Sequence, residues 1–285
     1  MVIPGPGWEE ICDIAEGTVF LLGGTGAGKT TLAGYIRGQV GDGVAWIDGD
    51  PGQSAVGPPG TLGLTRPDGT VSLRFTGATS PSMAPLATLS ALRCLLDEGK
   101  GGGASTVLVD SCGYIYGEGG VEFQRRSIEV LAPDQIIAIG STAELNAILS
   151  PFMRRPGLRV HRLPVSPHAR RRSQSARRRY RQERLLRWME EAEVRRWGEE
   201  IIRAGFFPER PRGHIAAVCD PGGRVLTAGI ILGVGRDMVV LAAPPPFAGE
   251  PAYFEAGRFR PGTGCLPSSL MASIPPYLYQ DSQER

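Results

Sequence analysis

The chain has little lysine, a single asparagine and no long hydrophobic run. Among its 31 basic residues only Lys29 and Lys100 are lysines. The one asparagine, Asn146, precedes Ala-Ile-Leu, so the N-K-x-D motif with which switch GTPases read guanine is absent. No stretch approaches the roughly 18 apolar residues of a membrane-spanning helix. The first residues also lack the basic segment and apolar run of a signal peptide. We therefore expect a cytoplasmic protein without membrane contact.

Cysteine is scarce too, and its spacing excludes two further classes of protein. The five cysteines are scattered and odd in number, without the spacing of metal ligands. This usage is typical of a reducing compartment and argues against a disulfide scaffold or a zinc site. The net charge of +2 by itself names no partner, and the 41% hydrophobic content is enough for a sizeable core.

A glycine loop near the N-terminus carries the clearest chemical signal. The pattern G-x-x-x-x-G-K-[ST] falls on residues 23–30, between an apolar run and an expected helix over 29–39. Backbone N–H groups of such a loop bind a polyphosphate, the lysine reaches its outer phosphates, and the threonine hydroxyl ligates Mg²⁺. A lysine kept at this position, where arginine replaces it almost everywhere else, favours a compact point charge. We predict a nucleoside-triphosphate site made by Gly23, Gly24, Thr25, Gly26, Ala27, Gly28, Lys29, Thr30 and Thr31.

Strands and helices alternate through the first 163 residues. Apolar runs predict strands over 18–22, 44–48, 70–76, 105–110, 135–139 and 158–163, with helices over 29–39, 85–98, 121–131 and 142–149. This alternation predicts an α/β P-loop NTPase fold with a mostly parallel sheet flanked by helices. Ligands then bind beyond the carboxyl ends of the strands, where Gly24, Asp50 and Asp110 fall.

The character of the chain changes after Pro164. An arginine-rich stretch predicts one long helix over 173–203, and three short apolar runs between 214 and 242 predict an antiparallel meander. We expect a P-loop domain over 1–204, with an arginine-rich lid at about 164–204, and a small β-rich region over 205–285. The tail after Pro244 shows no clear period.

Three acids follow two of the apolar strands. Asp50, in Asp50-x-x-Gln53, can accept the proton of an attacking hydroxyl, although Asp-Pro-Gly is also ordinary turn chemistry. Asp48 can orient metal-bound water or cap the loop. Val107-Leu-Val-Asp110 has the form of a Walker B strand, whose acid holds Mg²⁺. The predicted metal set is Thr30, Asp48 and Asp110, and whether Asp50 or Asp110 is the principal acid stays open.

The arginine-rich helix presents Arg177, Arg181 and Arg184 on one face. Such a face is commonly just solvated, but beside a phosphate loop it suits a lid that neutralises charge in the transition state. The same arginines, with those at 170–172, can instead bind a nucleic-acid backbone.

Four segments in this order resemble the polynucleotide 5′-hydroxyl kinases of the RNA-processing type. They are the phosphate loop, the block Asp48-Gly-Asp-Pro-Gly-Gln53, the segment Asp110-Ser-Cys-Gly-Tyr-Ile-Tyr-Gly117 and the lid block Arg177-Arg-Arg-Tyr-Arg-Gln-Glu-Arg184. The third is similar to the family's N-T-x-G-W-x-x-G clasp, with tyrosine in place of tryptophan and Asp-Ser in place of Asn-Thr. The short stretch before the first strand suggests a minimal, prokaryotic member without the N-terminal β-domain of eukaryotic relatives.

The resemblance implies a role for each matched residue. Asp50 would be the general base and Gln53 would place the incoming 5′ end. Gly113 and Tyr114 would hold the terminal nucleotides. Lys29 and the lid residues Arg177, Arg181 and Arg184 would complete the catalytic set.

The implied activity is transfer of the γ-phosphate of ATP or GTP, with Mg²⁺, to the 5′-hydroxyl of RNA or DNA. Two alternatives stay open: a nucleotide-binding scaffold of an RNA-processing assembly that does not turn over, and a P-loop kinase for a small molecule. The sequence gives no protein partner.

Overall fold

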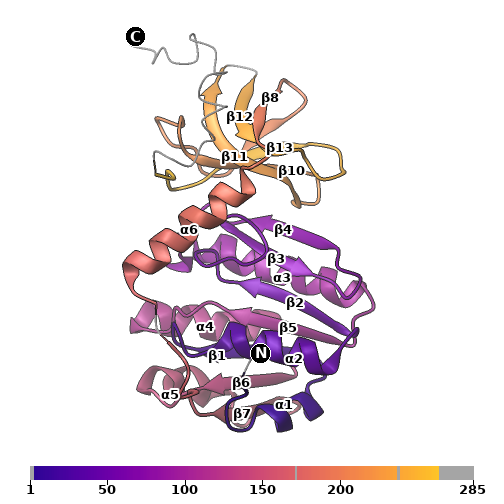
Figure 1. Ribbon diagram of the computed structural model, residues 1–285, viewed down its shortest axis with the longest axis vertical. Helices are drawn as coiled ribbons and strands as arrows, with labels where there is room; N and C mark the ends of the chain where they lie inside the picture. The colour runs from indigo at the N-terminus through magenta and orange to yellow at the C-terminus, as the bar shows by residue number, and fades with distance from the viewer. Residues whose placement is uncertain (1–2, 171, 236–237, 263–285) are drawn as a thin grey trace.

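The computed structural model describes residues 3–170, 172–235 and 238–262, which form two sheets joined by one long helix (Figure 1). The larger sheet has seven strands in the order β4-β3-β2-β5-β1-β6-β7. Their bounds are β1 Gly17–Gly23, β2 Val44–Gly49, β3 Thr61–Thr65, β4 Val71–Phe75, β5 Thr106–Ser111, β6 Gln135–Ile139 and β7 Arg159–Leu163. Five neighbouring strands of this order, β2, β5, β1, β6 and β7, are parallel to one another. Strand β3 is antiparallel to both of its neighbours, β2 and β4.

Helices cover both faces of this sheet, which is why its central strands are apolar throughout. The helices are α1 Trp8–Ile14, α2 Lys29–Val40, α3 Pro85–Gly101, α4 Gly117–Leu131 and α5 Ala143–Leu149, with 3₁₀ turns η1 Pro81–Met83 and η2 Ser150–Phe152. One core cluster lies beneath α1 and α2, and a second lies beneath α3, α4 and α5. The expected mostly parallel sheet flanked by helices is confirmed.

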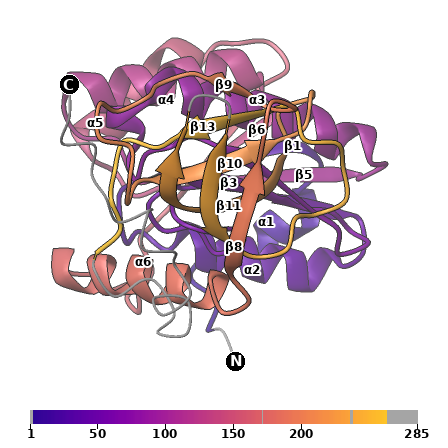
Figure 2. The ribbon, with the colours of Figure 1, turned by 90° about the horizontal axis from the view of Figure 1, so that it is seen from above.

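The second sheet has six strands in the order β8-β12-β11-β10-β13-β9 and lies above the β4 end of the larger sheet (Figures 1 and 2). Its strands are β8 Glu193–Trp197, β9 Ile202–Ala204, β10 Ile215–Cys219, β11 Val225–Val234, β12 Val239–Ala243 and β13 Tyr253–Ala256. The predicted meander is β10, β11 and β12, which pair antiparallel as expected. The remainder of the 205–285 region beyond residue 262 lies outside the described residues.

The long helix predicted over 173–203 is wrong in its second half. Helix α6, Gln174–Trp188, ends fifteen residues early, and the chain continues into β8 and β9 of the second sheet. The reason is tertiary, because β8 pairs along its whole length with β12, more than forty residues later. Residues 193–204 thus belong to the second sheet and not to the expected lid. Five short elements were also missed, namely α1, β3, β13 and the 3₁₀ turns η1 and η2.

Helix α6 connects the two sheets. Its last turn enters the core of the second sheet, where Leu185 and Met189 are buried with residues of β10, β11 and β12. The indole N–H of Trp188 donates to the carbonyl oxygen of Ala228 on β11, 2.9 Å away. The start of the helix lies near the edge of the larger sheet at which the carboxyl ends of β1, β2 and β5 are found (Figure 1). Among the described residues, no helix has the length and apolarity needed to cross a bilayer.

Candidate active site

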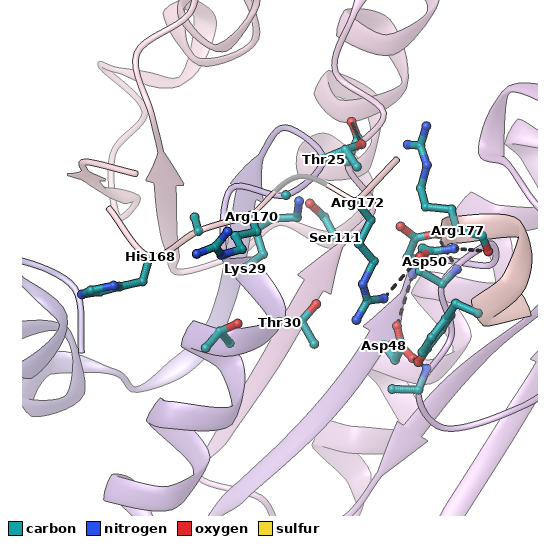
Figure 3. Close-up of a pocket in the computed structure, with 18 residues that line it drawn as sticks. Thr25, Lys29, Thr30, Asp48, Asp50, Ser111, His168, Arg170, Arg172 and Arg177 are labelled. Carbon is teal, nitrogen blue, oxygen red and sulfur yellow. Dashed lines mark hydrogen bonds between the residues drawn. The ribbon is translucent and has the colours of Figure 1, made fainter. Parts of the chain in front are cut away.

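The phosphate loop lies between β1 and α2 and lines a cavity of ≈ 270 Å³ at the carboxyl edge of the larger sheet (Figure 3). Gly26 and Gly28 adopt φ values of 79° and 100°, a backbone region that residues with a side chain rarely occupy. These two conformations let the loop turn tightly before α2 begins at Lys29. The loop and the first turn of α2 therefore form a concave, N–H-rich surface of the kind to which phosphate groups can bind.

Lys29 is held from below by the loop itself. Its ammonium donates to the carbonyl oxygens of Gly23, at 2.7 Å, and Gly24, at 3.1 Å, and its side chain is buried. The charge is thus desolvated and fixed beneath the cavity. No acid of the described residues is in hydrogen-bond contact with this ammonium, and a buried cation without such a partner favours an anionic ligand in front of it.

Thr30 and Asp110 meet at the start of α2. The Thr30 hydroxyl donates to Oδ2 of Asp110 at 2.6 Å, while Oδ1 of Asp110 is buried and has no hydrogen-bond partner among the described residues. Burial raises the pKa of Asp110 to about 6, against the opposing effects of the Lys29 charge and the Thr30 hydrogen bond. A carboxylate oxygen left unpaired beside a hydroxyl is a hard-oxygen set that suits Mg²⁺.

Asp48 serves the loop that follows β2. It is the β2 residue that lies opposite Asp110 in the parallel pairing of β2 with β5. Its two carboxylate oxygens accept hydrogen bonds from the backbone N–H groups of Asp50, Ala55 and Val56. Burial, followed by the Asp110 charge, raises its pKa to about 7. Of the two roles left open by the sequence, this geometry supports the loop cap.

Asp50 lines the cavity from the same loop, residues 50–60, which we call the Asp50 loop. Its Oδ1 accepts hydrogen bonds from the backbone N–H groups of Gly52, at 2.9 Å, and Gln53, at 3.1 Å. No described residue donates to Oδ2, and Asp50 lines the cavity. Burial raises the pKa of Asp50, and the two loop N–H groups and the positive charges of Lys29 and Arg181 oppose that rise. Asp50 is consequently positioned by one oxygen and free to take a proton on the other.

The three arginines predicted for the lid do not occupy equivalent positions. Arg177 lines the cavity. Arg181 is half-buried close enough to interact with the Asp50 charge, and desolvation lowers its pKa. Arg184 instead donates to the carbonyl oxygen of Ala55 at 2.7 Å and so fastens α6 to the Asp50 loop. A further contact from Tyr180, whose hydroxyl donates to the carbonyl oxygen of Ser54, holds the same interface together.

The segment between β7 and α6 brings residues to the cavity that the site prediction did not include. His168, Arg170 and Arg172 all line it, together with Lys29 (Figure 3). The Arg172 guanidinium stacks 4.7 Å from the centroid of the Tyr180 ring and lies 3.5 Å from the side-chain oxygen of Gln53. The run of arginines was the available signal, but only the course of the chain after β7 directs them into the site.

Of the three predicted substrate-binding residues, Gln53 and Gly113 line the cavity and Tyr114 does not. Gly113 lines the cavity, and a Cβ there would lie 2.5–2.7 Å from Thr25, so only glycine fits against the phosphate loop. Gln53 lines it too, and its amide donates weakly to the Arg177 carbonyl oxygen. Tyr114 is not among the lining residues.

Tyr114 packs toward α4 instead of the cavity. Its ring centroid lies 6.2 Å from that of Phe123, and its carbonyl oxygen accepts from the Gln124 amide. The exposed aromatic side chain of this segment is Tyr116, whose hydroxyl lies against Gly24, 2.8 Å from the place that a Cβ on that glycine would take. The expectation that Tyr114 faces the site is therefore not met.

Comparison with known proteins agrees with this architecture. The family model of the mRNA cleavage and polyadenylation factor CLP1 P-loop matches residues 23–191. The polyribonucleotide 5′-hydroxyl-kinase of Pyrococcus furiosus is 35% identical over 188 residues, which cover 62% of this chain and 51% of that protein. That of Methanocaldococcus jannaschii is 32% identical over 190 residues, with the same two coverages. The chain thus spans about half the length of the curated relatives that it matches.

A solved structure shares the fold. The Clp1p chain in the wild-type Clp1p–Pcf11p complex has a TM-score of 0.65 at 11% identity, covering 89% of this chain and 77% of that one. The matched residues 23–191 include the phosphate loop, the Asp50 loop and all of α6. The chain belongs to the CLP1 P-loop family.

Proposed function

We propose that the chain is a polynucleotide 5′-hydroxyl kinase that transfers the γ-phosphate of ATP, with Mg²⁺, to the 5′ end of RNA. The observation that carries this proposal is the position of Asp50: a carboxylate with one open oxygen faces the cavity that the phosphate loop lines. The names of the archaeal relatives support the polyribonucleotide substrate. GTP is an alternative donor and DNA an alternative acceptor.

The residues present fit a magnesium nucleotide. Loop N–H groups and Lys29 would bind the phosphates, and Thr30 with the unpaired Asp110 Oδ1 would hold the metal, directly or through water. The described residues contain no group of three or more His, Cys, Asp or Glu that could hold a metal. The ion would therefore need phosphate oxygens to complete its coordination, which ties metal binding to nucleotide binding. When bound, Mg²⁺ supplies charge neutralisation at the phosphates.

Asp50 would accept the proton as the substrate oxygen forms its bond to phosphorus. The 5′-hydroxyl loses its proton to Oδ2 as its oxygen forms a bond to the γ-phosphorus. The bond between that phosphorus and the oxygen of the leaving nucleoside diphosphate breaks. The Gly52 and Gln53 N–H groups hold the other carboxylate oxygen and fix its direction. Because burial raises the pKa of Asp50, it is a stronger base than an exposed aspartate.

The arginines would stabilise the charge that shifts during transfer. Arg177 lines the cavity from α6, and Arg170 and Arg172 line the cavity from the segment before α6. Arg181 interacts with the charge of Asp50. Arginine donors prepositioned around a phosphoryl group favour the transition state over the ground state when they meet it in the closed site. Gln53 and Gly113 would then contact the terminal nucleotides, from their positions in the cavity wall.

The test is incubation with donor labelled in the γ-phosphate and with 5′-hydroxyl RNA and DNA oligonucleotides separately. Label transferred to the 5′ end of RNA supports the proposal, and a 5′-phosphorylated oligonucleotide is the matched acceptor control. Stoichiometric nucleotide binding without transfer would identify a scaffold. Nucleotide hydrolysis or transfer that ignores both oligonucleotides would indicate a small-molecule kinase.

A further inference from the structure

The second sheet carries a surface of arginine and phenylalanine that the catalytic site does not use. It is made by Arg203, Phe206, Arg210, Arg258 and Arg260, all exposed, and we call it the Arg–Phe surface. Its residues come from two segments about fifty positions apart. The Arg260 guanidinium joins them by donating to the carbonyl oxygen of Arg210 at 2.7 Å. The parallel pairing of β9 with β13 brings the same two segments together.

No acid of residues 3–262 that the structure describes is paired with the arginines of this surface. None of its four arginines forms an ion pair with any acid in the described part of the chain. Two acids lie in or beside the first segment, Glu255 against Gly205 and the exposed Glu209 next to Arg210, and neither forms an ion pair with the four arginines. Cations on adjoining segments repel each other unless an anion approaches them. Charge complementarity therefore favours an anionic partner.

The aromatic component favours a nucleic acid over other anions. The Arg258 guanidinium lies 4.5 Å from the centroid of the Phe206 ring, which is 40% exposed. The same pairing recurs between Arg203 and Phe207, at 4.6 Å. Guanidinium planes and aromatic rings are the platforms on which unpaired bases stack, while arginine charge binds the phosphates between them.

Hydrogen bonds place this surface next to the Asp50 loop. The N–H of Gly60 donates to the carbonyl oxygen of Pro51, the residue after Asp50, at 2.9 Å. The N–H of Gly77 donates to Gly60 at 3.1 Å, and that of Arg258 donates to Gly77 at 2.6 Å. Three backbone hydrogen bonds thus connect Pro51, the residue after the proposed base, with Arg258.

We propose that the Arg–Phe surface binds single-stranded RNA downstream of the 5′ end that is phosphorylated. This inference rests on the proposed function, since it assigns the path of the same substrate beyond its terminal nucleotides. Gln53 and Gly113 hold the end in the cavity, and the strand continues past the 76–80 loop onto the second sheet.

The experiment compares two 5′-hydroxyl RNAs, one of about three nucleotides and one of about twelve, a length within the range that single-strand sites cover. The variants are Phe206→Ala and the double change Arg258→Gln with Arg260→Gln. Arg154→Gln is the matched control, because it removes an exposed arginine near α5, on the far side of the larger sheet from the second sheet (Figure 1). KM and kcat are measured for both RNAs over a series of salt concentrations.

We expect the long RNA to have the lower KM in the parent, and the variants to remove that advantage. Phe206→Ala should raise KM for the long RNA about tenfold. The double arginine change should reduce the slope of log KM against log salt by about 1.4, the loss expected for two phosphate contacts on a single strand. KM for the short RNA and kcat for both should stay unchanged, as should every parameter of Arg154→Gln.

Equal KM values for the two RNAs in the parent, or variants that leave KM for the long RNA and its salt slope unaltered, would overturn the Arg–Phe surface as an RNA site. That result leaves the proposed function standing, because both RNAs would still be phosphorylated. Absence of transfer to either RNA in the parent would instead refute the proposed function itself. Circular dichroism of each variant confirms that a raised KM does not come from unfolding.

Discussion

The hydroxyl of Thr30 and the carboxylate of Asp110 lie 2.6 Å apart, so the first turn of α2 is joined directly to the carboxyl end of β5. The second oxygen of Asp110 has no hydrogen-bond partner in the part of the chain that the structure describes. We expect Asp110→Asn to raise the Mg²⁺ concentration needed for half-maximal rate by at least about tenfold, since a neutral amide attracts the ion less. A magnesium titration of the initial rate measures this. Asp50→Asn is the comparison and should leave the magnesium requirement unchanged. Equal shifts in both would show that Asp110 has no special relation to the metal.

Asp50→Asn tests the proton acceptor. The change keeps the side-chain volume and still accepts from Gly52 and Gln53, but it removes the basic oxygen. We expect kcat to fall by about 10²- to 10⁴-fold, the usual range for a general base, while nucleotide affinity barely changes. Single-turnover transfer and nucleotide binding by calorimetry separate the two quantities. If Asp110→Asn lowered kcat at saturating magnesium far more than Asp50→Asn did, Asp110 would be the principal acid.

Lys29→Ala tests the phosphate site, and the chain supplies its own control in Lys100→Ala. Lys29 is buried beneath the cavity, whereas Lys100 is exposed near the end of α3. We expect Lys29→Ala to abolish turnover and to weaken triphosphate binding by about tenfold or more, because a charge-assisted contact contributes about 1.5–3 kcal/mol. Lys100→Ala should behave as the parent in both assays. Transfer at the parental rate by Lys29→Ala would reduce the loop to a structural turn.

Arg181 and Arg184 should differ although they share a helix face. Arg181 interacts with Asp50, so Arg181→Ala should lower kcat by about 10- to 100-fold and change KM less, below the range of a sole arginine finger. Arg184 fastens α6 to the Ala55 carbonyl oxygen, so Arg184→Ala should chiefly lower the free energy of unfolding, by about 1 kcal/mol. Steady-state kinetics at two salt concentrations and thermal melts distinguish them. An unchanged kcat with a raised, less salt-sensitive KM in Arg181→Ala would make the arginine a binding residue only.

Gly113→Ala tests the contact between the clasp segment and the phosphate loop. The new methyl group would lie within 2.7 Å of the backbone of Thr25, which cannot move without opening the loop. We expect nucleotide affinity to fall along with kcat. Gly119→Ala is the matched control, because its methyl group would meet only the terminal hydroxyl of the Tyr114 side chain. Unaltered nucleotide binding in Gly113→Ala would mean that the loop tolerates displacement at Thr25.

Most of the larger sheet could be predicted because its central strands are apolar throughout and each is followed by a recognisable turn or helix. Strand β3 was missed because the glycines and prolines on its N-terminal side are typical of a loop, and its strand conformation depends on pairing with β2 and β4. The end of α6 was missed for a similar reason. Residues 193–197 can continue a helix by local propensity, and only their pairing with β12 makes them a strand.

In the candidate site, too, local motifs could be predicted from the sequence, whereas contacts between distant segments could not. The phosphate loop and the acids after β2 and β5 follow from local motifs, since each lies at the end of a strand whose direction the motif implies. The inward course of Arg170 and Arg172, and the turning of Tyr114 toward Phe123, depend on contacts between distant segments. The unequal positions of Arg181 and Arg184 likewise require the Asp50 loop to be in place.

Helix α6 has its first half at the phosphate cavity and its last turn in the apolar core of the second sheet. A swing of the helix alone would pull Met189 and the Trp188 indole out of that core, which costs several kcal/mol for two large apolar side chains. The C-terminal end of the helix is therefore anchored in the second sheet. Displacing the arginines of its first half from the cavity would require the second sheet, whose core also includes Leu73 and Phe75 of β4, to move with the helix.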